Sequence, residues 1–230
     1  MPATSKPAAA EQGSAEQSPA EQGSAAPHAA VRPTPSAQQP EPSPIRLRPL
    51  TPADLPLLSQ WFSAAHVERW WHESSDLAEI RSEYLPSIEG SEPSHVLIAE
   101  LPAGPFGLAQ WYRWSDYPDH AHSLGADPDE AGFDYLIGSP DLCGRGIGTR
   151  LITALVKHIR ERDATVAGFV VDPEVANAAS RRILEKNGFE LIAVKEIPDP
   201  DGHPIGPTAI YRRRLASGQP ARSVCNLGGP

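Results

Sequence analysis

A glycine-rich loop at residues 143–149 limits the possible folds of this chain more than any other feature. It lies between a strand-like run and an amphipathic segment, and reads Cys143-Gly144-Arg145-Gly146-Ile147-Gly148-Thr149. Glycine has no Cβ, so successive backbone N–H groups of such a loop turn toward one anion, and the next helix adds the positive end of its dipole. The pattern predicts a strand, a phosphate-binding loop and a helix, with an ordinary tight turn as the alternative.

The spacing of the glycines indicates which phosphate ligand the loop suits. A nucleoside-triphosphate loop needs Lys and then Ser or Thr after its last glycine, but Gly148 is followed by Thr149 and Arg150. A dinucleotide fingerprint has glycines at relative positions one, three and six, whereas here they fall at one, three and five. The remaining pattern, x-x-G-x-G, is the one on which acyl-coenzyme A transferases hold a pyrophosphate. We therefore predict an acyl-CoA donor.

Two terminal segments have compositions that disfavour a packed core. Residues 1–44 contain nine prolines and two copies of the hexapeptide Ala-Glu-Gln-Gly-Ser-Ala, at 10–15 and 20–25. Such a segment cannot bury enough surface to offset its chain entropy. We expect a disordered Pro/Ala/Gln-rich tail at 1–44, a single domain at 45–215 and a flexible tail at 216–230.

The sequence lacks signals for membranes, export and disulfides. It has no run of about 18 apolar residues and no basic region followed by an apolar core at its N-terminus. We expect no membrane partner and a cytoplasmic location. Its two cysteines, Cys143 in the loop and Cys225 near the C-terminus, are not expected to form a structural disulfide.

The net charge limits the partners of the chain. The total is −9, of which the first 44 residues contribute −2 and the last fifteen +1, so residues 45–215 carry −8. Nucleic-acid binding needs a basic face, so we expect no nucleic-acid partner. A cationic small molecule would be attracted to such a surface, although the charge by itself also serves solubility. A monomer and a homodimer both stay open.

Hydrophobic periodicity predicts a mixed α/β domain. Apolar runs predict strands at 45–48, 95–101, 106–114, 132–138, 166–171, 190–197 and 208–214. Amphipathic stripes predict helices at 55–62, 76–87, 151–159 and 177–186. Trp70 and Trp71 are expected just after the first of these helices, and residues 102–105 in a turn.

The strand at 132–138 leads into the glycine loop and carries an acidic residue. Period two places Asp134 on the face shared with Leu136 and opposite Tyr135. The segment before this strand is predicted to be a polar loop over 127–130. His120-Ala121-His122 has no further ligand at metal spacing, so we interpret it as a solvated loop and expect no metal.

Three features of the sequence occur together: the glycine loop, Asn177 beyond it, and the run Glu185-Lys186-Asn187-Gly188-Phe189. On these features residues 45–215 resemble the Gcn5-related N-acetyltransferase (GNAT) superfamily. The resemblance implies a GNAT fold, in which helices flank a mixed, mostly antiparallel sheet in a single domain.

Within this superfamily, the chain is more similar to aminoglycoside 6′-N-acetyltransferases. The passages that carry the similarity are HVERWW at 66–71, EYLPS at 83–87, GLAQWY at 107–112 and GFDYLIGSP at 132–140. The resemblance implies an enzyme that moves the acetyl group of acetyl-CoA directly to a primary amine of a cationic small molecule. The 6′-amine of an aminoglycoside antibiotic is the expected acceptor, with resistance as the role.

The resemblance also implies roles for individual residues. An ammonium must lose a proton before its lone pair attacks a thioester, and Asp134 matches the family's catalytic aspartate. Backbone N–H groups near Leu136 would bind the thioester carbonyl and the developing oxyanion. The substrate-binding residues it implies are Trp71, Tyr84, Asp134 and Asp172. The donor-binding residues it implies are Leu136, Cys143, Gly144, Arg145, Gly146, Ile147, Gly148, Thr149 and Asn177.

Each role has a structural alternative. Asp134 would otherwise be an exposed strand residue, Asp172 a turn residue before a proline, and Asn177 a helix cap. Trp71 and Tyr84 would otherwise belong to the core. Cys143 is not expected to be a nucleophile, because the family transfers the acyl group directly between two bound substrates.

One position departs from the family pattern. Related enzymes have Tyr on the helix before Glu-Lys-x-Gly-Phe, where it can protonate the departing thiolate, and Leu184 stands there in this chain. A thiol whose pKa is near that of free Cys, about 8.5, can leave without an acid. We therefore predict that Leu184→Tyr does not abolish turnover.

Two other functions stay open at this point. One is a siderophore-biosynthesis acyltransferase that acts on a hydroxylysine or hydroxyornithine side chain; its members tend to have His where this chain has Asp134. The other is a non-catalytic acyl-CoA-binding regulatory module, which the missing tyrosine at Leu184 would favour and Asp134 would not.

Overall fold

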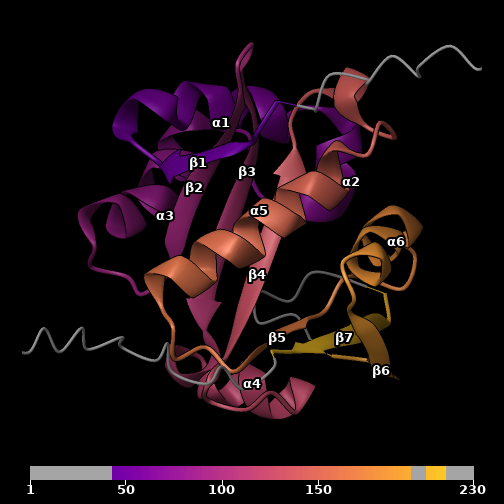
Figure 1. Cartoon of the computed structure of the whole chain (residues 1–230). Coiled ribbons are helices and arrows are strands. Elements are labelled where there is room, and N and C mark those ends of the chain that lie inside the picture. Colours follow the sequence, from indigo (N-terminus) through magenta and orange to yellow (C-terminus); the bar gives the residue numbers. More distant parts are fainter. Residues whose placement is uncertain (1–42, 198–205, 216–230) are drawn as a thin grey trace, which may run out of the picture. The chain divides into compact units, whose positions relative to one another are not determined.

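The structure, a computed structural model, describes residues 43–197 and 206–215. They form a seven-stranded sheet of order β1-β2-β3-β4-β5-β7-β6 with helices on both faces (Figure 1). The strands are β1 (Arg46–Pro49), β2 (His95–Leu101), β3 (Gly104–Arg113), β4 (Glu130–Ile137), β5 (Gly168–Val171), β6 (Glu190–Lys195) and β7 (Thr208–Arg214). The α-helices are α1 (Leu55–Phe62), α2 (Ala65–Trp71), α3 (Leu77–Glu89), α4 (Pro118–Leu124), α5 (Ile147–Arg162) and α6 (Ala178–Lys186). Three short 3₁₀ helices, η1 (Pro52–Asp54), η2 (Trp114–Asp116) and η3 (Pro140–Leu142), lie between them.

Part of the sequence lies outside the described residues. The predicted tails at 1–44 and 216–230 fall there apart from Ser43 and Pro44, and so does Cys225. Within 43–197 and 206–215, no helix has the length and apolar character that crossing a membrane requires.

The sheet is antiparallel except between β4 and β5, which confirms the mixed, mostly antiparallel architecture. β4 pairs with β3 along residues 131–137. Its parallel pairing with β5 is confined to two residue pairs, Glu130 with Gly168 and Ala131 with Phe169. Beyond Ala131 the two strands diverge. The edge of β4 from 132 to 137 therefore has no strand partner on that side among the described residues.

Different helices cover the two faces of the sheet. On one face, α5 lies across the strands (Figure 1), and Leu155 packs in one cluster with Phe133. On the other face, Leu58 of α1 packs with Leu108 and Leu136. Fully burying side chains of this size stabilises the fold by roughly 1.5–3 kcal/mol each. The opposite placement of Phe133 and Leu136 confirms the period-two reading of β4.

The two helices that follow the glycine loop, α5 and α6, form where the sequence predicts them, and α5 extends beyond the predicted 151–159 at both ends. Gly146 is the N-cap of α5, so the helix starts inside the loop. Asn177 caps α6, because its Oδ1 accepts a hydrogen bond from Ser180 N at 3.0 Å. α6 ends before Gly188, which has a left-handed φ of 76°. The prediction that Asn177 caps the following helix is confirmed.

Two short helices were not predicted, and one of them replaces a predicted loop. Trp70 and Trp71, expected just after α1, form the last turn of α2, a separate helix that follows α1. Residues 118–124 form α4 where a solvated loop was expected, since Ala121 and Leu124 turn inward and are buried. Each helix is only seven residues long, too short for its periodicity to stand out in the sequence.

The polar segment at 127–130 is also corrected. β4 begins at Glu130, which is fully buried instead of lying in a loop. Its Oε2 accepts hydrogen bonds from Asp127 N at 2.9 Å and from the Arg212 guanidinium at 3.1 Å. A buried carboxylate is stable when paired in this way. The partner Arg212 lies on β7, far along the chain, so the sequence pattern gave no sign of it.

Candidate functional site

Three cavities lie along the open edge of β4. We call them the apolar cavity (about 310 Å³), the junction cavity (about 260 Å³) and the acidic cavity (about 610 Å³). The apolar and junction cavities share Trp70, Trp71, Tyr135, Asn177 and Ser180 as lining residues. The junction and acidic cavities share Asp134 and Asp172. The junction cavity thus borders both of the others.

The glycine loop adjoins the apolar cavity and shows why glycine is needed there. Gly144 and Gly146 have left-handed φ angles of 73° and 78°, which cost a residue with a side chain roughly 1–2 kcal/mol. Gly148 serves a different purpose, because a Cβ on it would lie 2.6 Å from Cδ1 of Ile183 on α6. The first two glycines set the loop conformation, and the third allows α5 and α6 to pack closely.

The loop is also tied to α6 through its backbone. Asn187 Nδ2 donates a hydrogen bond to Thr149 O at 3.2 Å, and Thr153 Oγ1 donates to Asn187 Oδ1 at 2.8 Å. Ile147 is buried in the core, whereas Arg145 is exposed. The side chain of Ile147 therefore cannot contact a ligand bound at the loop. Only the backbone N–H of Ile147 could contribute to binding such a ligand.

Cys143 has an environment that suppresses thiol chemistry. It is exposed, and its Sγ donates a long hydrogen bond to Ser139 O at 3.8 Å. Desolvation raises the pKa of the thiol, so its nucleophilic thiolate form is disfavoured.

The apolar cavity is lined by three chain segments from α2, β4 and α6. Leu136 and Asn177, both predicted to contact the donor, lie in its wall. Near one end, His66 Nε2 donates a hydrogen bond to Ile137 O at 2.8 Å and so holds α2 against the edge of β4. Asn177 thus caps α6 and lines the cavity at the same time.

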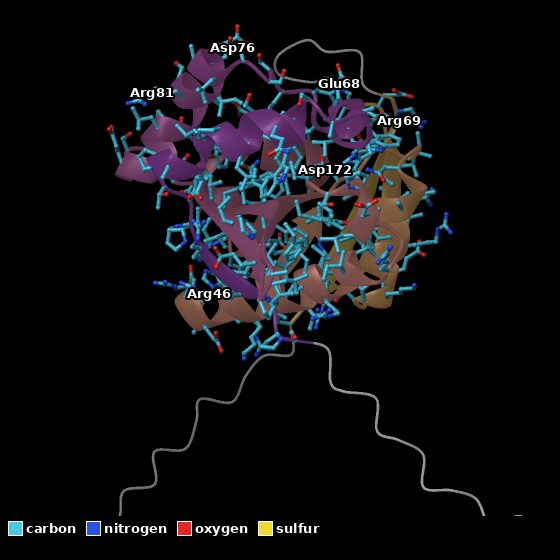
Figure 2. All side chains as sticks on the ribbon, turned by 90° about the horizontal axis from the view of Figure 1, so that it is seen from above. Arg46, Glu68, Arg69, Asp76, Arg81 and Asp172 are labelled. Atoms are coloured by element: carbon cyan, nitrogen blue, oxygen red, sulfur yellow. The ribbon has the colours of Figure 1, made fainter. Side chains whose placement is uncertain are left out.

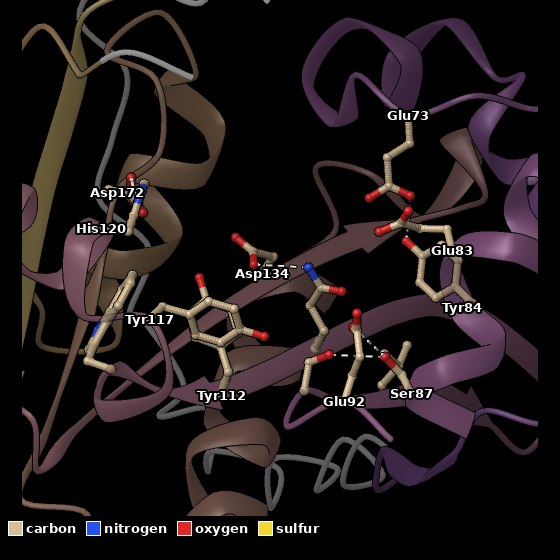
Figure 3. Close-up of a pocket in the computed structure, with 14 residues that line it drawn as sticks. Glu73, Glu83, Tyr84, Ser87, Glu92, Tyr112, Tyr117, His120, Asp134 and Asp172 are labelled. Atoms are coloured by element: carbon tan, nitrogen blue, oxygen red, sulfur yellow. Dashed lines mark hydrogen bonds and ion pairs between the residues drawn. The ribbon is translucent and has the colours of Figure 1, made fainter. Parts of the chain in front are cut away.

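The acidic cavity collects carboxyl groups from separate elements. Figure 3 shows Asp134 in the middle of the pocket, with Glu73 and Glu83 on one side and Asp172 on the other. In Figure 2, Asp172 lies inward of the charged residues labelled at the surface of α2 and α3. Fourteen residues line the cavity: Glu73, Glu83, Tyr84, Ser87, Glu92, Ser94, Val96, Gln110, Tyr112, Trp114, Tyr117, His120, Asp134 and Asp172.

Asp134 has the properties of a general base. Its Oδ2 accepts a hydrogen bond from Gln110 Nε2 at 3.1 Å, across the β3–β4 pair. Burial and the charge of Asp172 raise its pKa to about 6, while Gln110 and Tyr112 act in the opposite direction. A carboxylate with a pKa this close to neutrality accepts a proton more readily than an ordinary aspartate.

Glu73, which the sequence did not single out, is a second carboxyl with a raised pKa. Tyr84 Oη donates a hydrogen bond to Glu73 Oε2 at 2.6 Å. Burial raises the Glu73 pKa to about 7, and the charges of Glu83 and Asp134 add to the rise. Tyr84 itself is 3% exposed, so it is both a core residue and the hydroxyl that holds Glu73 in the cavity wall.

The other predicted substrate residues occupy different places. Trp71 stacks on Phe62 with ring centroids 6.0 Å apart and lines the apolar and junction cavities, not the acidic one. Asp172 Oδ2 lies 3.4 Å from His120 Nε2, a contact that is an ion pair when His120 is protonated, and His120 stacks on Trp114. His120, expected in a solvated loop, is therefore a lining residue. Sequence reasoning missed it because α4 brings it to the site from a distant segment.

Leu184 is buried, at 1% exposed, and lines the junction cavity. Its side chain has no hydrogen to donate to a ligand. This position therefore faces the junction cavity without a proton donor of its own.

Comparison with known proteins places the chain in a family. The profile of the acetyltransferase (GNAT) domain matches residues 51–197, and the chain belongs to this family. An aminoglycoside N(6′)-acetyltransferase type 1 from Klebsiella pneumoniae is 33% identical over 158 residues, which cover 67% of this chain and 78% of that protein. Lysine N-acyltransferase MbtK from Mycobacterium tuberculosis is 25% identical over 159 residues, which cover 68% and 75%.

Solved structures agree with this assignment. AAC(6′)-Ib in complex with ribostamycin and coenzyme A matches with a TM-score of 0.65 and 32% identity, over 74% of this chain and 93% of that one. The complex of AAC(6′)-Ib with paromomycin and acetyl-CoA matches with a TM-score of 0.61 and 30% identity, over 74% and 93%. The family, the fold and the N-acetyltransferase class expected from the sequence are confirmed.

Proposed function

We propose that this chain uses acetyl-CoA to acetylate a primary amine of a polycationic small molecule, namely the 6′-amine of an aminoglycoside antibiotic. The position of Asp134 carries the proposal, because this carboxyl lines both the acidic and the junction cavity, as Asp172 does, and it also lies on β4, the strand that contributes to the wall of the apolar cavity. A base placed there serves an amine that enters from the acidic side and a thioester held on the other side. The similarity to aminoglycoside acetyltransferases supports the same acceptor.

The residues around the apolar cavity are suited to acetyl-CoA. Left-handed Gly144 and Gly146 leave the loop backbone free of side-chain atoms, as close approach of a pyrophosphate requires. The edge of β4 from 132 to 137 has backbone groups without a strand partner, which suit the amide-bearing arm of the donor. Bound there, acetyl-CoA would supply an acetyl group activated as a thioester.

The acidic cavity is suited to a polycation. Its volume of about 610 Å³ lies within the roughly 300–1,000 Å³ typical of small-molecule sites. Five carboxyl groups line it, and one imidazole faces them. An acceptor with several ammonium groups would be attracted to these carboxylates and oriented by them. An amine with a single charge would use only part of this surface.

The proposed reaction assigns one proton transfer to the protein. Asp134 accepts a proton from the acceptor's ammonium group, and the freed amine forms a bond with the acetyl carbonyl carbon. A backbone N–H near Leu136 donates a hydrogen bond to the developing oxyanion. The carbon–sulfur bond then breaks, its electron pair leaves with the sulfur, and the nitrogen gives up its second proton to solvent to leave a neutral amide.

Acetylation of kanamycin by the purified full-length chain tests the proposal. Thiol release from acetyl-CoA and a product acetylated at the 6′-amine are expected, with little release on paromomycin, which has a hydroxyl group at that position. Release with a hydroxylysine-type amine but not with aminoglycosides would favour a siderophore-type acyltransferase instead. Donor binding without thiol release on any amine of a broad panel would overturn the enzymatic role.

A further inference from the structure

A pair of hydroxyl groups lies close to the inert side chain of Leu184. Ser180 is four residues before Leu184 on α6 and therefore on the same face of that helix. Its Oγ is 3.0 Å from Tyr135 Oη on β4. The two residues bring hydroxyl groups together from elements on opposite sides of the opening between β4 and α6.

Both hydroxyl groups face the region where the reacting groups must meet. Tyr135 and Ser180 line the junction cavity together with Asp134, and they also line the apolar cavity. Asp134 lies on one face of β4, and Tyr135 lies on the opposite face. If the thioester lies between Asp134 and Tyr135, Asp134 is on the side of the attacking amine. The hydroxyl pair of Tyr135 and Ser180 is then on the side of the departing sulfur.

Both residues are held in place by independent contacts. Tyr135 packs against two core clusters that include Phe133 and Leu151. The backbone N–H of Ser180 donates to the Asn177 side chain at 3.0 Å, which fixes the first turn of α6. The pair is therefore preorganised before any ligand binds, as effective charge stabilisation requires.

The hydroxyl groups of Tyr135 and Ser180 together have one hydrogen left to donate to a third group. Each hydroxyl group has one hydrogen, and the bond between the two oxygens uses one of them. Burial raises the pKa of Tyr135 to about 12, so its phenol keeps its hydrogen at neutral pH. When Tyr135 donates to Ser180, the hydrogen of Ser180 stays available for a third group.

We propose that Ser180, positioned by Tyr135, donates a hydrogen bond to the sulfur of coenzyme A as the thiolate departs, and so replaces the acid missing at Leu184. This inference rests on the proposed function. In this step the carbon–nitrogen bond forms, the carbon–sulfur bond breaks, and sulfur takes the electron pair. Asp134 takes the first proton from the ammonium group before attack and passes it to water, and the nitrogen releases its second proton to water as the tetrahedral intermediate collapses. The thiolate leaves stabilised by the Ser180 hydrogen bond.

The kinetic test removes each hydroxyl group separately. Because Ser180 donates a charge-assisted hydrogen bond to the leaving sulfur in this proposal, Ser180→Ala should lower kcat by roughly tenfold to a hundredfold. The KM for acetyl-CoA should change little. Tyr135→Phe should have a smaller effect of the same kind, and Ser180→Thr should keep most of the activity. Ser123→Ala, at an exposed serine of α4 outside the three cavities, is the matched control.

A rescue experiment separates this role from a packing role. Leu184→Tyr added to Ser180→Ala should recover much of the lost kcat, because it supplies another hydroxyl group from the same helix face. Leu184→Phe has the same ring without the hydroxyl group and should not recover it. Equal recovery by tyrosine and phenylalanine would contradict the proposal.

Titration of bound coenzyme A tests the same contact without catalysis. The ultraviolet absorbance of the thiolate gives the pKa of the bound thiol, which should be higher in Ser180→Ala than in the wild type by about 1. This measurement needs only donor binding, so it remains decisive if kanamycin and every other amine fail as acceptors. An unchanged thiol pKa in Ser180→Ala, or a wild type that does not bind coenzyme A, would overturn the inference.

Discussion

The apolar cavity and the acidic cavity adjoin the same stretch of β4 but are built differently. The apolar cavity takes its lining from only three chain segments, 66–71, 135–143 and 177–183. The acidic cavity takes its lining from segments spread between residues 73 and 172. The glycine loop, which depends on its backbone conformation, adjoins the apolar cavity. Charged side chains dominate the lining of the acidic cavity. A local motif can therefore specify the proposed donor side, but only the assembled fold brings together the proposed acceptor side.

The largest expected effect tests Asp134, which lines the acidic cavity and the junction cavity that separates it from the apolar cavity. Asp134→Asn should lower kcat/KM for kanamycin by at least ~10²-fold, the scale on which a general base acts. Donor affinity, measured by calorimetry, should stay unchanged, because the loop and the apolar cavity are intact. Asp129→Asn, which removes the same charge at an exposed loop position, should behave like the wild type. Full activity of the Asp134 variant would remove this residue from the mechanism.

The next effect tests whether backbone conformation specifies the donor side. Gly146→Val should weaken acetyl-CoA binding roughly 5- to 30-fold, because a left-handed φ costs a side-chain-bearing residue about 1–2 kcal/mol. No atom lies within 4 Å of an added Cβ at this position, so steric contact does not contribute. Gly146→Asn should lose much less, since Asn tolerates this conformation. Equal losses in both variants, measured by calorimetry, would show that conformation is not the cause.

A smaller effect tests whether charge specifies the acceptor side. Glu73→Gln should raise KM for kanamycin roughly tenfold at pH 8, where the carboxyl is ionised. The difference should shrink as the pH falls through about 7, because burial raises the Glu73 pKa to that value and the group becomes neutral below it. KM for acetyl-CoA should not change. Glu68→Gln, at an exposed position on α2, is the control, and a pH-independent defect at Glu73 would argue against a charge effect.

The smallest effect concerns the pH dependence of the base itself. Since Asp134 acts as a carboxylate, wild-type kcat/KM should fall as the pH decreases through about 6. The charge of Asp172 is one cause of this raised pKa. Asp172→Asn should therefore move the acidic limb of the profile to lower pH, whatever it does to KM. An acidic limb that does not move in Asp172→Asn would show that the charge of Asp172 does not contribute to the raised pKa of Asp134.

Much of the fold could be predicted from the sequence because its signals are local. The stripe of α5, the cap at Asn177 and the alternation along β4 each depend on residues within a few positions of one another. Short α2 and α4 were missed because seven residues give too little periodicity. Glu130 was misplaced in a loop because its partner, Arg212, lies on another strand of the sheet.

Some residues of the candidate site could likewise be predicted from the sequence, and others could not. Asp134 and the glycine loop were found because strand alternation and glycine spacing are visible in the sequence. Glu73 and His120 were missed because nothing in their own segments distinguishes them from surface residues. Their roles depend on Tyr84 in one case and on Asp172 in the other, and only folding brings these pairs together.

The sequence by itself determined the family, the glycine loop and the strand alternation that places Asp134. Glycine conformation and strand periodicity are properties of a few neighbouring residues, so they can be read before folding. The tertiary structure alone decided that β4 and β5 pair at only two positions, and that carboxyl groups from distant segments share one cavity. It also decided that Tyr135 and Ser180 lie 3.0 Å apart beside Leu184. Burial and long-range charge arise only when the chain is packed, and they raise the pKa values on which the proposed chemistry depends.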